Sequence, residues 1–293
     1  MNQTKKITKA VIPAAGLGTR MLPIARAVPK EMLPIVDKPA ISYLVDEAAD
    51  SGITDILIIT GRNKDAMEDY FDYSPEYEEK LRGGGKLDKI EELRRAASRV
   101  NVSFMRQLET KGLGHAISRA RAFTGDDPFV VLYGDDIIVS ETPVCKQLID
   151  AYERYGKGAA AMREVPLEAV SKYCSLDVTH LDGCCYDVHT MVEKPKPEEV
   201  YSRFAILGRV LLTPEIYDIL DRTEPGAGGE IQLTDAMRVL AESAGMIGVD
   251  FEGRRYDMGS KLGMLTANVE QAVRHEEIGE SFKEFLREFV KTL

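Results

Sequence analysis

Two patterns of apolar and polar positions alternate along this chain. Short runs rich in β-branched residues occur at residues 9–13, 55–60, 100–105 and 129–133, and helix-like patterns fill the segments between them. Runs that are apolar throughout are typical of strands buried on both faces. Strands that alternate with helices at this spacing predict right-handed βαβ units. We therefore expect an α/β, Rossmann-like fold, with a mixed, mostly parallel sheet flanked by helices.

Three further segments depart from this alternation. Residues 74–99 are strongly charged and are interrupted by the triplet Gly83 to Gly85, which predicts a solvated helical excursion with a flexible turn. Residues 158–212 contain shorter strand-like segments with turn signals, which favours antiparallel additions to the sheet. Residues 260–293 repeat apolar positions at helical spacing, so we expect a C-terminal helical tail that caps the core or joins two subunits. No linker separates these parts, and we expect a single domain over residues 1–293.

Composition narrows the class of protein. The 293 residues are 44% hydrophobic and 29% charged, as in ordinary globular chains. A net charge of −10 disfavours unspecific binding to nucleic acid or to an anionic membrane, so we expect neither as a partner. The basic start of the chain lacks the apolar stretch of a signal peptide, and no segment is long and apolar enough for a membrane span. We expect a cytoplasmic protein whose four cysteines, which show no CxxC spacing, stay reduced.

The first chemical signal follows the first expected strand, where residues 14–20 read AAGLGTR. Glycines allow close approach of the backbone, and successive N–H groups can cradle a phosphate or pair with a base edge. A dinucleotide-binding loop would need glycine where this chain has Met21, and the Gly-Lys-Ser/Thr of a P-loop is absent. Taken alone, this loop is a plain turn as often as a ligand site. Lys30, taken alone, reads as a surface lysine beside Glu31.

The whole run from residue 14 to residue 39, with GLGTR followed by PKEMLPIVDKP, resembles the signature loop of the sugar nucleotidyltransferases. Its residues are most similar to the bacterial UTP-glucose-1-phosphate uridylyltransferases. The resemblance implies the fold of nucleotide-diphospho-sugar transferases and the conversion of UTP and α-D-glucose 1-phosphate to UDP-glucose and diphosphate. Further matches follow in order along the chain at Gln107 with 112–116, 133–136, 192–195, 205–209, 229–235 and 256–260.

Phosphate-binding cations are the first requirement of that reaction, because an anionic sugar phosphate must attack an anionic nucleotide. Catalysis then relies on in-line positioning and on charge neutralisation. The resemblance implies that Arg20 binds the leaving β,γ-phosphates and Lys30 the α-phosphate. It further implies that Lys194 holds the sugar phosphate and that Glu193 accepts hydrogen bonds from sugar hydroxyls. Without the other motifs, residues 193–195 would read as a turn with a local ion pair.

A magnesium site is expected near Asp135, which follows an apolar strand at the edge where parallel sheets bind ligands. Mg²⁺ takes hard oxygen ligands, keeps several waters and uses one or two carboxylates together with substrate phosphates. By resemblance, Asp135 is the first ligand and Asp257 the second, although an Asp before Met-Gly also suits a turn. The string YGDD at 133–136 also occurs in RNA-dependent polymerases, but no further acidic motif or basic channel accompanies it here.

Base recognition is expected from the signature backbone and from Gln107, whose amide offers both a donor and an acceptor. We treat His115 as a packing residue rather than a general base. The expected nucleotide-binding residues are Ala14, Ala15, Gly16, Gly18, Thr19, Gln107, Gly112 and Asp136. The expected sugar-binding residues are Cys174, Glu193, Lys194 and Gly208.

Two departures from the family pattern affect the sugar. Cys174 stands where the family usually has glycine, and Val210 replaces a common tyrosine, so glucose is less firmly implied than uridylyl transfer. The competing readings are a thymidylyltransferase or other nucleotidyltransferase, a homologue that binds nucleotide sugars without turnover, and a nicotinamide-dependent oxidoreductase. A non-catalytic homologue would have lost the cations or Asp135, which are all present. The family implies a homodimer or homotetramer.

Overall fold

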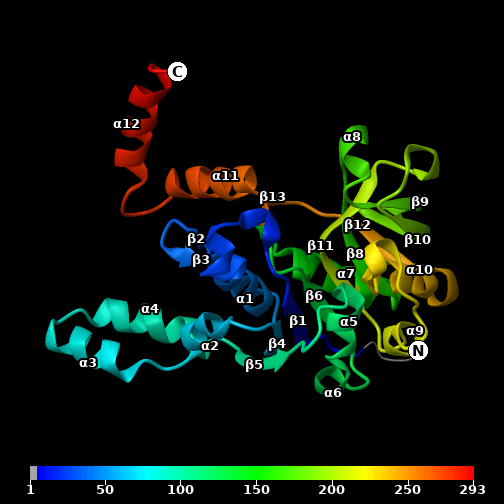
Figure 1. Ribbon diagram of the computed structural model, residues 1–293, viewed down its shortest axis with the longest axis horizontal. Coiled ribbons are helices and arrows are strands. Elements are labelled where there is room, and N and C mark those ends of the chain that lie inside the picture. The colour runs from blue at the N-terminus through cyan, green and yellow to red at the C-terminus, as the bar shows by residue number, and fades with distance from the viewer. Residues whose placement is uncertain (1–4) are drawn as a thin grey trace.

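A nine-stranded mixed sheet forms the centre of the computed structural model (Figure 1), which describes residues 5–293 apart from the side chains of residues 92, 93, 96, 97 and 227. The first residues of the basic N-terminal lead lie outside this part. The strand order is β5-β4-β1-β6-β11-β8-β12-β10-β9. The sheet strands are β1 Lys9–Ala14, β4 Asp55–Thr60, β5 Asn101–Arg106, β6 Phe129–Leu132, β8 Gly158–Glu164, β9 Cys174–Asp182, β10 Cys185–Glu193, β11 Phe204–Leu212 and β12 Met246–Asp250.

Strand direction divides this sheet into two parts. β5, β4, β1 and β6 pair in parallel, whereas β11 is antiparallel to both β6 and β8. β12 is parallel to β8, and the hairpin of β9 and β10 closes the far edge in antiparallel pairing. Only β11 and β10 therefore run against the other strands of the sheet. The expected α/β fold with a mixed, mostly parallel sheet is confirmed, and so are the antiparallel additions after residue 158.

Helices cover both faces of the sheet. The helices are α1 Ala40–Asp50, α2 Asp65–Phe71, α3 Pro75–Gly83, α4 Leu87–Ser98, α5 Leu113–Ser118, α6 Arg121–Thr124, α7 Val144–Tyr155, α8 Leu167–Val170, α9 Ile216–Leu220, α10 Leu233–Ala244, α11 Lys261–Ala272 and α12 Gly279–Val290. Alternate strand residues enter two separate apolar clusters, as Val11 and Ile12 do on β1. One cluster includes α1 and α7, and the other includes α5, α9 and α10. Burial on both faces explains the uninterrupted apolar runs.

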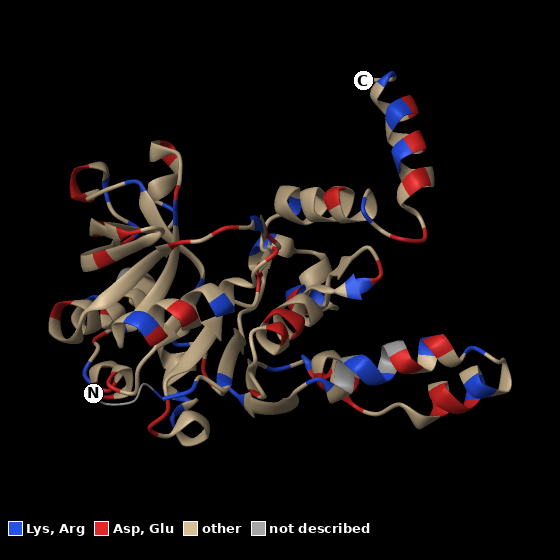
Figure 2. Cartoon of the chain, turned by 180° about the vertical axis from the view of Figure 1, so that it is seen from behind, with Lys and Arg blue, Asp and Glu red and all other residues tan. Residues whose placement is uncertain are grey.

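Two helical pairs project from this body. The hairpin of α3 and α4 matches the expected charged excursion, and its turn lies at Gly83 to Gly85. Acidic and basic residues are interspersed along its described part (Figure 2). The expected helical tail is also present, because α11 and α12 extend beyond the sheet toward the C-terminus (Figure 1). In residues 5–293, no helix combines the length and the apolar character that crossing a bilayer requires.

Candidate active site

The signature loop follows β1 and lies between the loops that follow β4 and β6. Two glycines allow this close packing. A Cβ atom added to Gly61 would lie 2.9 Å from the carbonyl oxygen of Ala15, and one added to Gly134 would lie 2.9 Å from that of Pro13. Gly18 has a φ of 65°, which favours glycine, and turns the chain into the 3-10 turn η1 (Thr19–Met21). The carboxyl ends of the parallel strands thus converge on this loop.

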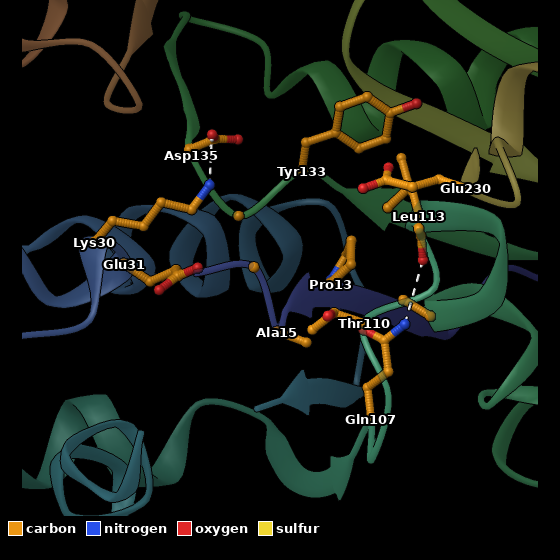
Figure 3. A pocket seen from close by; sticks show the side chains of 14 residues that line it. Pro13, Ala15, Lys30, Glu31, Gln107, Thr110, Leu113, Tyr133, Asp135 and Glu230 are labelled. Carbon is orange, nitrogen blue, oxygen red and sulfur yellow. Dashed lines mark hydrogen bonds and ion pairs between the residues drawn. The ribbon is translucent and has the colours of Figure 1, made fainter. Parts of the chain in front are cut away.

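A cavity of about 260 Å³ opens at this edge of the sheet (Figure 3). Six of the residues expected at the site line it, together with residues that the sequence did not single out, such as Glu31 and Glu230. The expected residues that line the cavity are Ala15, Gly16, Lys30, Gln107, Gly112 and Asp135. Residues that lie outside its lining are Ala14, Gly18, Thr19, Arg20, Asp136, Cys174, Glu193, Lys194, Gly208 and Asp257.

Cations and carboxylates alternate at one side of the cavity. Lys30 Nζ lies 2.6 Å from Asp135 Oδ2, a contact that Figure 3 marks with a dashed line, and Arg20 Nη2 lies 3.4 Å from the same oxygen. Arg20 Nη1 lies 3.7 Å from Asp257 Oδ2. Burial alone would raise the pKa of the Asp135 carboxyl, but Lys30 and Arg20 hold that pKa below its usual value. Asp135 is therefore ionised at neutral pH and faces two cations that a bound phosphate would share.

Asp135 and Asp257 come together through a small antiparallel ribbon. Strand β7 (Asp136–Val139) pairs with β13 (Arg254–Asp257), and this register places Asp136 opposite Asp257. A Cβ atom added to Gly259 would lie 2.5 Å from Arg20 Nη2, 2.7 Å from Asp135 Oδ2 and 3.0 Å from Asp257 Oδ1, so the glycine leaves room for the Arg20 guanidinium between the two carboxylates. In the described part of the chain, no group of three or more ligating side chains forms a closed metal site. An open pair of carboxylates suits a hard divalent cation that completes its shell with water and phosphate.

Gln107 marks the other end of the cavity, directly after β5. Its Nε2 lies 2.9 Å from His115 Nδ1 and 3.3 Å from the carbonyl oxygen of Gly112. Gly112 has a φ of 103°, and a Cβ atom there would lie 2.7 Å from the carbonyl oxygen of Ile231, so only glycine fits. Ile231 also accepts a hydrogen bond from the N–H of Gly114. Ile231, in the string at 229–235, thus fixes the position of the loop that carries Gly112.

The expected sugar residues lie on the antiparallel part of the sheet. Glu193 pairs with Cys174 across β9 and β10, and the backbone N–H of Lys194 donates to the carbonyl oxygen of Tyr173. The Lys194 side chain is 54% exposed, and its Nζ lies 3.9 Å from Glu193 Oε1, so its partner is the other expected sugar residue. Tyr133 lines the cavity and also neighbours Cys174 and Glu193. Burial and these two neighbours raise the pKa of its hydroxyl.

Cys174 and Gly208 have structural surroundings. Cys174 Sγ accepts a hydrogen bond from the N–H of Ile206 at 3.3 Å, and burial raises the pKa of the thiol to about 12. Gly208 has a φ of 77°, and a Cβ atom there would lie 2.7 Å from Asp136 Cβ. Its carbonyl oxygen accepts from the N–H of Tyr133. In this geometry both residues act on the site by shaping the strands beneath it.

Asp136 differs from its expected role as a nucleotide contact. Its side chain is buried, with Oδ1 2.5 Å from Arg255 Nη2, and burial raises the pKa of the carboxyl to about 6. Arg209 Nη1 donates to the carbonyl oxygen of Asp136 at 2.8 Å, while Nη2 of the same guanidinium lies 2.6 Å from Glu47 Oε2. Asp136 therefore belongs to a buried polar network below the site, which favours a supporting role over direct contact with a nucleotide.

A second buried pair supports the signature loop. Lys64 Nζ lies 2.8 Å from Glu31 Oε2 and also donates to the carbonyl oxygen of Ala14. Sequence reasoning treated Glu31 only as the neighbour of Lys30 and passed over Lys64, Glu47 and Arg255. Their sequence positions carry no periodic signal, because each pair joins residues from distant elements. The GRNK string after β4 was the one local hint for Lys64.

Comparison with known proteins agrees with this geometry. The family model described as nucleotidyl transferase matches residues 9–273. A UTP–glucose-1-phosphate uridylyltransferase of Bacillus subtilis (strain 168) is 48% identical over 282 residues, which cover 96% of this chain and 97% of that protein. One with the same name from Staphylococcus epidermidis is 48% identical over 97% of this chain and 99% of its own.

Solved structures give the same result. A UTP-bound UGPase from Acinetobacter baumannii superposes with a TM-score of 0.90 at 34% identity, covering 97% of this chain and 99% of that one. A UDP-glucose pyrophosphorylase complexed with UDP-glucose has a TM-score of 0.85 at 42% identity, covering 92% of this chain and all of the other. The chain therefore belongs to the nucleotidyl transferase family, and within it to the group of UTP–glucose-1-phosphate uridylyltransferases.

Proposed function

We propose that this chain transfers a uridylyl group from UTP to α-D-glucose 1-phosphate and releases diphosphate. The observation that carries the proposal is the cluster of Lys30, Arg20, Asp135 and Asp257 beside a cavity that ends at Gln107. Cations for phosphates and an amide for a base edge thus lie at opposite ends of one site. The relatives that share nearly the whole chain are named for this reaction.

In the proposed mechanism, an oxygen of the sugar phosphate forms a bond to the α-phosphorus of UTP. The bond from that phosphorus to the oxygen bridging toward the β-phosphorus breaks, and diphosphate leaves with the electron pair. The attacking oxygen is already ionised, so no side chain needs to remove a proton. This explains how the site can work without a catalytic histidine. His115 packs against Gln107 instead.

Each cation has one part in this mechanism. Lys30 exchanges Asp135 for the α-phosphate when nucleotide binds, and Arg20 neutralises the leaving phosphates. Lys194, whose exposed side chain pairs with Glu193 at 3.9 Å, turns to the phosphate of the incoming sugar phosphate. Glu193 accepts hydrogen bonds from the sugar hydroxyls. Gln107 and the backbone of Ala14, Ala15 and Gly16 select the pyrimidine, with Gly18 and Thr19 shaping the phosphate loop.

Asp135 and Asp257 are the proposed ligands of a magnesium ion. Gly259 leaves room between them, where the Arg20 guanidinium lies, and the described residues bring no third carboxylate to the pair, which fits a cation that prefers phosphate and water as its other ligands. Magnesium would neutralise charge on the α- and β-phosphates as the bond breaks. The two carboxylates orient such an ion, and Lys30 holds the phosphate beside it.

A thymidylyltransferase is the second candidate within the same chemistry. A putative glucose-1-phosphate thymidylyltransferase from Bacillus anthracis shares the fold, with a TM-score of 0.71 at 22% identity. One methyl group separates the two bases and discriminates by only about 1–3 kcal/mol in a hydrophobic pocket. The higher identity of the uridylyltransferases favours UTP for this chain.

The test is diphosphate release with each common nucleoside triphosphate, paired in turn with the 1-phosphates of glucose, galactose and N-acetylglucosamine. We expect release with UTP and glucose 1-phosphate, and its loss when a chelator replaces magnesium. Release with another pair would mean that the enzyme uses a different nucleotide or sugar, and Cys174 would then be the first residue to examine as the cause. No diphosphate release with any pair would contradict the proposal and favour a homologue that binds nucleotides without turnover.

We also propose that the chain forms a homodimer or homotetramer through its C-terminal helices. α12 exposes Phe285 and Phe289, whose rings stack 5.7 Å apart, while the helix lies apart from the sheet (Figure 1). Exposed stacked aromatic side chains are typical of a surface that a partner covers. Light scattering on the full chain and on a Phe285→Ser, Phe289→Ser variant tests this, and a monomeric parent protein would contradict it.

A further inference from the structure

The side-chain amide of Gln107 has one defined orientation at its end of the nucleotide cavity. Its nitrogen Nε2 lies 3.3 Å from the carbonyl oxygen of Gly112, drawn as the second dashed line of Figure 3, and 2.9 Å from His115 Nδ1. A carbonyl oxygen only accepts hydrogen bonds, so the amide atom that faces Gly112 has to be the NH2 group. The opposite orientation would bring two carbonyl oxygens together. The amide therefore directs its nitrogen toward Gly112 and His115.

The same contacts define the state of the His115 ring. The NH2 group carries two hydrogens, one for the carbonyl oxygen of Gly112 and one for His115 Nδ1. Nδ1 has to accept this hydrogen bond, which requires a neutral ring with its proton on Nε2. Burial and the nearby cations of Lys111 and Arg119 lower the pKa of His115, which favours the neutral ring.

The position of the His115 ring depends on the short helix α5. This helix begins at Leu113, and the N–H of Gly114 ties its first turn to the carbonyl oxygen of Ile231. The Ser118 hydroxyl donates to the carbonyl oxygen of His115 at 2.8 Å. His115 itself is half-buried and lies outside the lining of the cavity. An anchored helix thus presents the imidazole to Gln107 from behind the site.

The orientation of the amide leaves Gln107 Oε1 for a ligand. Gln107 lines the cavity together with Ala15 and Gly16, and among the residues that the structure describes no donor forms a hydrogen bond with Oε1. An acceptor here suits uracil, whose N3 carries a hydrogen, whereas N3 of cytosine is itself an acceptor. Gln107 is buried, so a base that leaves Oε1 unpaired is disfavoured.

We propose that His115 is a positioning residue for base selection, which holds the carbonyl oxygen of Gln107 toward the base and thereby favours UTP over CTP. This inference rests on the proposed function for the identity of the substrate. His115 contacts no substrate and moves no proton, because it acts through Gln107. Without the ring nitrogen, only the carbonyl oxygen of Gly112 would hold the amide. The amide could then rotate and present its NH2 group, which is the partner that N3 of cytosine needs.

Calorimetric titration of the full chain with UTP and with CTP, both in the presence of magnesium, tests the inference without any turnover. In His115→Leu, we expect the ratio of UTP affinity to CTP affinity to fall about tenfold, as loss of one hydrogen bond does. His115→Asn should keep most of the parent ratio, because its carbonyl oxygen can accept near the place of Nδ1. His189→Leu is the matched control, since His189 is an exposed histidine on β10 that pairs with Thr179.

A double-variant cycle separates positioning from general packing. Gln107→Leu removes the amide on which His115 acts, so adding His115→Leu should cause no further loss of the ratio. A packing role would make the two losses add. In the forward reaction, His115→Leu should raise the KM for UTP about tenfold and leave kcat within about twofold, since the base contact is the same before and during the reaction. If His115→Leu does not fold, His115→Phe gives the same comparison with a ring that lacks an acceptor.

An unchanged ratio of UTP to CTP affinity in a folded variant without the acceptor would overturn the inference. An equal fall in His115→Asn or in His189→Leu, or full additivity with Gln107→Leu, would do the same. So would a parent protein that binds UTP and CTP equally tightly. If the chain turned over no nucleotide, a preference for UTP that depends on His115 would still support the inference, so the proposed function and this inference fail separately.

Discussion

Asp135 and Asp136 are consecutive carboxylates in opposite surroundings. Asp135 faces the cavity with a side chain that is 21% exposed, and Lys30 keeps its pKa below the usual value. Asp136 points into the protein, where burial raises its pKa to about 6 although Arg255 lies beside it. Asp135 lies in the turn that the N–H of Asp136 closes by donating to the carbonyl oxygen of Tyr133, and Asp136 begins β7. One step along the chain thus separates a side chain at the cavity from one that is buried below it.

The cations follow the same division. Lys30 and Arg20 lie where a phosphate can replace their carboxylate partners, whereas Arg209 is fully buried and holds Glu47 and the backbone of Asp136. Burial of an ion pair costs desolvation energy that its attraction repays only with good geometry. The buried network therefore supports the site through the position of the backbone, and the exposed cluster supports it through charge.

The largest expected effect comes from the exposed cluster. Lys30→Ala and Asp135→Asn should each lower kcat about 10⁴-fold, because each removes a charge that the transition state needs. The free energy of unfolding should change little, since both side chains face the cavity. Steady-state kinetics and urea denaturation measure the two quantities.

Asp126→Asn, at an exposed position near the start of β6, is the matched control and should keep the parent rate. A folded Lys30 or Asp135 variant with a rate near that of the parent would remove the roles assigned to these residues.

The buried network should show the reverse pattern. Glu47→Gln leaves the Arg209 guanidinium without its buried counter-charge, and we expect the free energy of unfolding to fall by about 3–5 kcal/mol. A double variant, Glu47→Met with Arg209→Met, removes both charges and should recover much of that loss. Denaturation in urea compares the variants. A loss below about 1 kcal/mol in Glu47→Gln would place this pair with ordinary surface ion pairs.

Asp136 should give the folded protein a distinct pH dependence. Its folded pKa of about 6 lies above the usual value of 3.8, so between these values the folded state keeps a proton that the unfolded chain has lost. The free energy of unfolding therefore falls as the pH rises through this window and levels off above pH 6. Relative to Asp136→Asn, the parent should lose on the order of 2 kcal/mol between pH 4.5 and 7. A constant difference between the two proteins would contradict this.

The smallest effect is expected at Lys194, which belongs to neither group. Lys194→Gln should raise the KM for glucose 1-phosphate about tenfold, because one charge-assisted contact is lost. Binding of UTP, measured by calorimetry, should remain as in the parent protein. An equal loss of UTP binding would show that the lysine acts on the nucleotide rather than on the sugar phosphate.

The sequence predicted the parts of this molecule that rest on local pattern. Asp55–Thr60 forms the expected strand, β1 extends one residue beyond its expected range, and the glycine triplet turns the charged hairpin where expected. The loop after β1 and the carboxylate after β6 also lie where the sequence predicted them, because the ends of apolar strands and the glycines are recognisable locally. The roles that came from family resemblance remain predictions, and the variants above test those of Lys30, Asp135 and Lys194.

Contacts between residues far apart in the chain could not be predicted from local sequence patterns. Glu47 and Arg209 are 162 residues apart, and the sequence around either residue gives no signal that predicts the ion pair. Asp136 was expected to contact the nucleotide, because the string YGDD does not show that its side chain is buried where β7 pairs with β13. Arg255 follows from the same pairing. Such contacts depend on tertiary packing, which one sequence without aligned relatives does not encode in a visible period.

The ribbon of β7 and β13 has a consequence for the order in which the protein is made. Asp135 and Asp257 meet only through this ribbon, although more than a hundred residues separate them in the chain. Synthesis proceeds from the N-terminus at about 5–20 residues per second, so the nucleotide loop and Asp135 emerge from the ribosome well before Asp257 does. A partly made chain can fold its first strands and expose the phosphate loop, yet it lacks the second carboxylate until nearly all of the chain has emerged.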